Sequence, residues 1–203
     1  MTLVMAFAGG KGAAMAGDMR EITFLGDPAS IALLERELYA GDLATDDRLL
    51  ARAGELGVEL SIRDDKVKVR ERGGVLVGEV TSLEGGVLRS RRVYATAGAY
   101  AIADFGGEAP VLRGQGGAGN FVVLGNELTK AIANRCIRER WKGGGLPDAV
   151  EILAGALGEA AAATPSVSRR FILVQTGEKA DLGKVMEEDG IPGPAGSRER
   201  PGG

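Results

Sequence analysis

Apolar runs and glycine breaks alternate along the first part of the chain. Residues 2–8 form an apolar run that ends at Gly9-Gly10, and residues 12–17 form a second run of small apolar residues. Two short apolar runs around a glycine turn are typical of a buried hairpin. We therefore predict that this hairpin supplies two central strands, with a third short strand over residues 21–25.

Helical spacing of apolar positions appears later, in two pairs of segments. The predicted helices cover residues 28–40, 46–56, 127–142 and 148–163. Alternating or buried-type patterns predict strands over residues 58–63, 66–80, 87–97, 121–124 and 171–175. Residues 104–119 are rich in glycine and are expected to form a loop region. Helices that segregate from hairpins favour an α+β layered fold over a doubly wound parallel sheet.

Composition narrows the chemistry more than the fold. The 203 residues carry 25 Lys and Arg against 28 Asp and Glu, a net charge of −3, which argues against broad binding to nucleic acid or anionic membranes. The chain has one Cys and no His. This excludes an intrachain disulfide, Ser-His-Asp and Cys-His catalysis, and His-ligated zinc. We expect no metal or cofactor.

The ends of the sequence set the expected domain organisation. No basic leader and no apolar run of about 20 residues is visible, so we expect a cytoplasmic protein without membrane insertion. From residue 187 the chain is rich in Gly, Pro and charge. We predict one domain over residues 1–186, with a helical insertion at about 28–56, and a disordered tail over 187–203.

Thr2 is the first candidate for chemistry. Initiator Met is normally removed before a small residue, and the mature chain would then begin with Thr at the start of a buried strand. An N-terminal Thr carries its own base, because its α-amine has a pKa of about 8 and lies beside the hydroxyl. In a chain without His, this is the most economical activated nucleophile, although Thr at position 2 is also common without function.

Other candidates follow the predicted strands. Asp18 and Arg20 end the second apolar run, where the alternative is a simple strand-end ion pair. Lys66 and Lys68 alternate with apolar positions, and a lysine that points inward could lower the pKa of a nearby amine. Thr96-Ala97-Gly98 ends a strand, and such a glycine lets backbone N–H groups approach a reacting carbonyl as an oxyanion hole requires.

Two further signals carry less weight. Gly114, Gly116 and Gly119 have the spacing of a dinucleotide-binding loop, but a strand-like run follows where that motif needs a helix. Cys136 lies on the apolar side of a predicted helix, which indicates a buried and inert thiol.

Taken together, these residues resemble the proteasome β-subunit pattern of the N-terminal nucleophile hydrolases. Sixteen positions separate Thr2 from Asp18, Asp18-Met19-Arg20 is similar to the D-x-R motif, and residues 68–71 are similar to the K-V-x-E strand. Thr96-Ala97-Gly98 is similar to the T-x-A-G oxyanion turn. The resemblance implies a four-layer αββα sandwich, here with a helix pair inserted before the lysine strand and without the helices that normally follow the glycine turn.

A closer resemblance is to connectases, archaeal proteasome-like protein ligases of methanogens. It rests on M-A-G-D-M-R-E-I at 15–22, V-L-V-G-E-V at 75–80, Y-A-T-A-G-A-Y-A at 94–101 and T-P-S-V-S at 164–168. The similarity runs from Thr2 to about Gln175. Connectases carry a further C-terminal domain, whereas this chain has a Gly/Pro tail at that place.

The resemblance implies an activity and a partner. Connectases cut Lys-Asp-Pro-Gly-Ala between Asp and Pro, hold the upstream part on the N-terminal residue, and pass it to another Pro-Gly-Ala terminus. The implied partner is the motif-bearing subunit of the methanogen tetrahydromethanopterin methyltransferase, with no nucleic acid. The implied catalytic residues are Thr2, Asp18, Lys68 and Gly98, with Lys66 open as the lysine, and Arg20 or Arg63 is expected to meet the substrate.

Two other functions are compatible with the same residues. One is a non-catalytic scaffold or binding protein on the proteasome-like fold, because a fold alone does not establish an activity. The other is a threonine peptidase that releases a free acid.

Overall fold

The computed structural model of the chain describes residues 3–84 and 87–191. The strands are β1 (Val4–Gly9), β2 (Gly12–Asp18), β3 (Glu21–Leu25), β4 (Glu59–Arg63), β5 (Val69–Arg72), β6 (Val75–Glu84), β7 (Val87–Thr96), β8 (Ala99–Phe105), β9 (Val111–Gly117), β10 (Asn120–Leu124) and β11 (Phe171–Thr176). The helices are α1 (Pro28–Ala40), α2 (Asp46–Glu55), α3 (Glu127–Arg140), α4 (Leu146–Ala163) and α5 (Leu182–Glu188).

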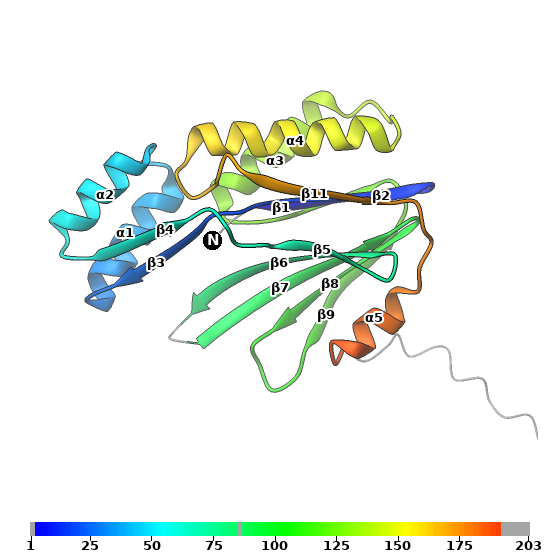
Figure 1. Ribbon diagram of the computed structural model, residues 1–203, viewed down its shortest axis with the longest axis horizontal. Coiled ribbons are helices and arrows are strands. Elements are labelled where there is room, and N and C mark those ends of the chain that lie inside the picture. The colour runs from blue at the N-terminus through cyan, green and yellow to red at the C-terminus, as the bar shows by residue number, and fades with distance from the viewer. Residues whose placement is uncertain (1–2, 85–86, 192–203) are drawn as a thin grey trace, which may run out of the picture.

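The described strands form three antiparallel sheets. A four-stranded sheet has the order β10-β1-β2-β11, a five-stranded sheet has the order β5-β6-β7-β8-β9, and β3 pairs with β4 alone. The two larger sheets stack face to face, and α3 and α4 cover the outer face of the four-stranded sheet (Figure 1). The α+β class predicted from the sequence is therefore confirmed.

Alternation along the central hairpin explains the stacking. Leu3, Met5, Ala14 and Ala16 face α3 and α4, whereas the neighbouring positions of β1 and β2 face the five-stranded sheet. Both faces of this hairpin are buried, so its sequence reads as continuous apolar runs instead of an alternating pattern.

The fourth layer is smaller than predicted. On the outer face of the five-stranded sheet, only α5 packs against the described strands, where Val185 and Met186 contact the side of the sheet that carries Tyr94. Ile191 belongs to the same cluster and is buried. The prediction that the folded domain ends at residue 186 is therefore wrong, because the packed chain reaches Ile191; residues 192–203 of the predicted tail lie outside the described residues.

The predicted helix pair is confirmed, and it belongs to a larger insertion. The β3–β4 ribbon and helices α1 and α2 share their own apolar cluster, which includes Leu34, Leu38 and Leu49. Asp27 caps the start of α1 by accepting a hydrogen bond from the Ser30 N–H, as expected for an Asp-Pro helix start. The insertion therefore spans residues 21–63 and lies at one end of the stacked sheets (Figure 1).

Two strand predictions are corrected. The segment 66–80 is not one strand, since Gly73 and Gly74 both adopt positive φ and turn the chain between β5 and β6. The glycine-rich segment 104–119 is not a loop, because most of it forms β9 and the end of β8. Glycine lowers strand propensity, but pairing with β8 provides a ladder of hydrogen bonds that compensates for it.

Candidate active site

Asp18 is the centre of the candidate site, at the end of β2. Its side chain is completely buried, and its carboxylate accepts hydrogen bonds from the backbone N–H groups of Leu3 (2.9 Å), Arg20 (2.8 Å) and Ser168 (3.3 Å). A buried carboxylate needs several donors to compensate for lost hydration. The contact with Leu3 fixes Asp18 beside the first described residue of the chain.

Lys68 completes this pair from the segment just before β5. Its Nζ lies 3.0 Å from both carboxylate oxygens of Asp18 and 2.6 Å from the carbonyl oxygen of Arg20, to which it donates. Burial lowers the pKa of Lys68 below the ordinary value of a lysine, while the charge of Asp18 acts in the opposite direction. The buried ammonium is thereby easier to deprotonate than a surface lysine, as acid–base work near neutral pH requires.

Lys66 takes a different environment from Lys68. Its Nζ lies 2.6 Å from Glu21 Oε1, and both side chains are about one-third exposed. The hydrogen bond from Lys66 lowers the pKa of Glu21. Of the two lysines left open by the sequence, Lys68 is therefore the one that contacts Asp18.

Ser168 and Ser166 join the site from the loop between α4 and β11. Ser168 contributes its N–H to Asp18, and Ser166 is buried where the Thr164 hydroxyl donates to its Oγ (3.1 Å). Sequence reasoning assigned no role to either serine. The available signal was the T-P-S-V-S stretch, whose short polar residues are buried here at a distance of 150 positions from Asp18.

Arg20 does not act as predicted. Its guanidinium donates to both oxygens of Asp64 (2.9 and 3.0 Å), to Asp46 (2.5 Å) and to the carbonyl oxygen of Pro165 (2.8 Å), and its side chain is 10% exposed. Each of its three guanidinium nitrogens is thus engaged with this chain. The prediction that Arg20 binds substrate is therefore wrong; Arg20 instead ties the insertion to the core.

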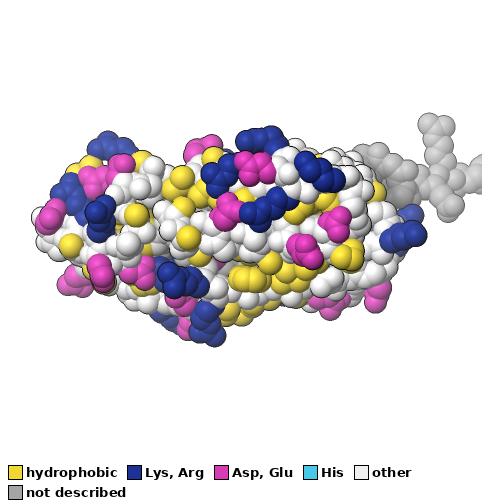
Figure 2. Space-filling model, turned by 90° about the horizontal axis from the view of Figure 1, so that it is seen from above, with side chains coloured by type: hydrophobic (Ala, Val, Ile, Leu, Met, Phe, Trp, Pro, Cys, Tyr) yellow, Lys and Arg dark blue, Asp and Glu magenta, His cyan; other side chains and the backbone are white. Residues whose placement is uncertain are grey.

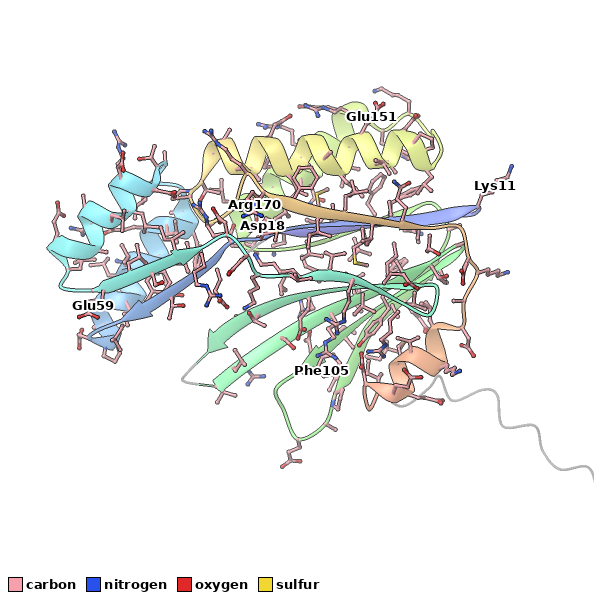
Figure 3. All side chains as sticks on the ribbon, in the orientation of Figure 1. Lys11, Asp18, Glu59, Phe105, Glu151 and Arg170 are labelled. Atoms are coloured by element: carbon pink, nitrogen blue, oxygen red, sulfur yellow. The ribbon has the colours of Figure 1, made fainter. Side chains whose placement is uncertain are left out.

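Gly98 is also in the wrong place for its predicted role. Its N–H donates to the carbonyl oxygen of Gly9 at 2.8 Å, at the end of β1 opposite to Leu3. At about 3.3 Å per residue, the strand separates the two ends by roughly 20 Å. Figure 3 shows the same separation, with Lys11 and Asp18 at opposite ends of the β1–β2 hairpin. Gly98 therefore cannot be an oxyanion donor beside Asp18.

Thr2, the predicted nucleophile, lies outside the described residues. What the structure describes is its immediate neighbour, since the N–H of Leu3 is the group that Asp18 holds. Arg63, the other cation considered for substrate, lies on the exposed insertion and pairs with Asp65 at 2.9 Å.

A groove of about 450 Å³ opens beside this pair, between the insertion and the projecting ends of β6 and β7. We call it the apolar groove; its lining includes Ile22, Phe24, Ile31, Leu88, Lys68 and Ser166. It joins the buried Asp18–Lys68 pair to solvent through an apolar surface, which is the form expected of a site for an extended peptide.

Comparison with known families identifies the family of the chain. Residues 1–190 match the family described as "Connectase MJ0548-like, N-terminal domain". This chain belongs to the connectase family. Membership implies a protein ligase or transpeptidase role, with a protein substrate. A comparison with curated protein sequences found no match.

Solved structures of proteasome-like proteins are similar to this connectase-family chain at low identity. HslV from Trypanosoma brucei is 16% identical with a TM-score of 0.39, over 86% of this chain and 98% of that chain. The Anbu complex from Pseudomonas aeruginosa is 10% identical with a TM-score of 0.42, over 86% and 80%. Anbu from Yersinia bercovieri is 10% identical with a TM-score of 0.41, over 86% and 81%.

The described part of the chain also bears on membranes. Within residues 3–84 and 87–191, none of the helices combines the length and apolar character that a bilayer crossing needs.

Proposed function

We propose that this chain is an N-terminal threonine transpeptidase that cuts and rejoins a Lys-Asp-Pro-Gly-Ala-type sequence between Asp and Pro. The observation that carries the proposal is the buried Asp18–Lys68 pair bound to the N–H of Leu3, one peptide bond from Thr2. An acid–base pair held beside the start of the chain suits a nucleophile that carries its own amine.

The proposed reaction begins once Met1 has been removed. The Thr2 hydroxyl oxygen attacks the Asp carbonyl of the substrate, and its proton passes to the Thr2 α-amine. The Asp–Pro bond breaks, an ester to Thr2 forms, and the leaving proline nitrogen takes a proton. Lys68 stabilises the charge that develops and keeps the pKa of the nearby amine low by repulsion, while Asp18 fixes Lys68.

Ligation is the reverse of this step with a new amine. The proline nitrogen of an incoming Pro-Gly-Ala terminus attacks the acyl group, a peptide bond forms, and the Thr2 hydroxyl is regenerated. Transfer of the acyl group from the oxygen to the α-amine of Thr2 would store it as an amide, which resists water. The proposed substrate is a protein that carries the motif, such as the methyltransferase subunit described above.

Mass spectrometry tests the proposal directly. The purified chain should lack Met1, and incubation with a peptide containing Lys-Asp-Pro-Gly-Ala should add the mass of the upstream fragment. Thr2→Ala should abolish the adduct, and Thr2→Ser should retain it because the hydroxyl remains. An adduct in Thr2→Ala would remove Thr2 from the mechanism. Free acid as the main product would indicate a threonine peptidase, and retention of Met1 a binding protein.

A further inference from the structure

A second cavity lies next to the apolar groove and differs from it in charge. It has a volume of about 340 Å³, and we call it the basic pocket. Its lining includes the cations Arg89, Arg91, Arg113 and Lys130 and the anion Asp104. Thr81 and Ser82 line both cavities, so the two are continuous along β6.

Strand alternation explains why these cations converge. On β7, Val93 and Ala95 face the four-stranded sheet and are buried there, so Arg91 and Arg89 point to the same side two and four positions before Val93. At this point the four-stranded sheet has ended, and β6 and β7 project beyond it (Figure 1). The arginines therefore face a cavity where their strand neighbours face a core.

The charges of the pocket do not cancel. Asp104 accepts from Arg91 (2.5 Å) and from Arg113 (2.7 Å), which hold the pKa of its carboxyl below the usual range. Lys130 pairs with Glu127. Even with Glu127 included, the described side chains around the pocket carry four positive and two negative charges.

Other charged surfaces of the chain are balanced by contrast. Figure 2 shows Lys and Arg side chains interspersed with Asp and Glu on the face that carries α4. There, Arg135 and Arg140 both pair with Glu159. An excess of cations inside a cavity that continues the candidate substrate groove calls for an anionic ligand.

We propose that the basic pocket binds an acidic side chain of the peptide substrate, next to the sequence that is cut; this rests on the proposed function. Glu79, which donates its N–H to the carbonyl oxygen of Lys68, lies three residues along β6 from Ser82, about 10 Å in an extended strand. The acidic residue would thus lie some three or four positions from the cut bond. A pocket of this volume admits a carboxylate and excludes a duplex.

Three peptides test the proposal. Each contains Lys-Asp-Pro-Gly-Ala: one has serines on both sides, one has two glutamates immediately before the motif, and one has two immediately after. The wild-type chain should show a KM lower by roughly tenfold for one glutamate peptide, with kcat little changed, as expected for loss or gain of one charged hydrogen bond. Equal KM values for the three peptides would overturn the proposal.

Variants then assign the effect to the pocket. Arg89→Gln/Arg113→Gln, which keeps the Arg91–Asp104 pair, should remove the preference for glutamate, whereas Arg135→Gln on α3 should retain it. Asp104→Asn should strengthen the preference because it removes the internal anion, a gain that misfolding would not produce. A glutamate preference that persists in the double arginine variant would contradict the proposal.

A binding measurement separates this proposal from the transpeptidase activity. Fluorescence polarisation of the labelled peptides should show tighter binding of the same glutamate peptide, abolished in Arg89→Gln/Arg113→Gln, even if no adduct forms. Adducts without glutamate preference would leave the activity standing and overturn the pocket. Tighter binding of a single-stranded oligonucleotide, lost in the same variant, would also overturn it.

Discussion

The ammonium of Lys68 lies 3.0 Å from both carboxylate oxygens of Asp18, and both residues are almost completely buried. They come from segments 50 positions apart and meet beside the N–H of Leu3. Because a buried carboxylate and a buried ammonium each need the other, this contact fixes both the fold at the start of the chain and the proposed catalytic geometry.

Breaking this pair should destabilise the chain strongly. Lys68→Met leaves Asp18 buried without its cation, so we expect a loss of about 3 to 5 kcal/mol in unfolding free energy, measured by urea denaturation. Lys66→Met is the matched control, since its partially exposed pair with Glu21 should contribute less than about 1 kcal/mol. Equal losses in the two variants would show that burial does not distinguish the lysines.

Arg20 should behave as a structural residue. Arg20→Gln removes the charged contacts that link Asp64, Asp46 of α2 and the Pro165 carbonyl, so we expect a loss of about 2 to 4 kcal/mol. Arg63→Gln, on the exposed pair with Asp65, should change stability by less than about 0.5 kcal/mol. If Arg20→Gln instead raised KM for peptide at unchanged stability, Arg20 would be a substrate-binding residue after all.

Gly98 should matter for stability and not for acyl transfer. Its φ of +88° is unfavourable for residues with a side chain, so Gly98→Ala should cost about 1 to 2 kcal/mol. Because Gly98 lies at the far end of β1, the rate of adduct formation measured below the unfolding transition should be unchanged. A loss of rate of about a hundredfold would restore the oxyanion assignment.

Gly78 lets the two large sheets approach closely. A Cβ at this position would lie 2.7 Å from both Met15 Sδ and Val4 Cγ1, so Gly78→Ala should destabilise the chain by about 1 to 3 kcal/mol. At Gly114 of β9, a Cβ would meet nothing within 4 Å, and Gly114→Ala should be neutral or slightly stabilising. Thermal unfolding of both variants checks the contrast, and a loss at Gly114 as large as that at Gly78 would contradict it.

Asp189 should make part of the stability depend on acid pH. Burial opposes its charge, but hydrogen bonds from Tyr94 (2.6 Å) and Arg72 (2.9 Å) outweigh it and hold the pKa of Asp189 below its usual range. A carboxyl whose pKa is lower in the folded state stabilises above its unfolded pKa, about 4, and this contribution is lost as the pH falls through the folded value.

Asp189→Asn should therefore cost about 2 kcal/mol at pH 7, and the difference from the wild-type chain should shrink below about pH 4. Urea denaturation at pH 7, 5, 4 and 3 measures this. Asp181→Asn at the exposed start of α5 is the control, and a difference for Asp189→Asn that stays constant over this range would contradict the assignment.

Local pattern was enough to determine much of the fold. The continuous apolar runs of β1 and β2 predicted a buried hairpin, and helical spacing with Asp27-Pro28 predicted α1, because these signals act within a few residues. The same local reasoning failed at Gly73-Gly74 and at β9, where glycine has no side chain to signal pairing and the partner strand decides the conformation.

The site shows the same division more sharply. Sequence alone determined which residue types were available, since a chain without His leaves a terminal amine, carboxylates and lysines for acid–base chemistry. Only the tertiary structure decided that Lys68 and Ser168 reach Asp18, that Arg20 is occupied by Asp46 and Asp64, and that Gly98 lies at the wrong end of β1. The physical reason is that hydrogen bonds and burial depend on which segments meet in space, and contacts over 44 to 150 positions leave no periodic trace in the sequence.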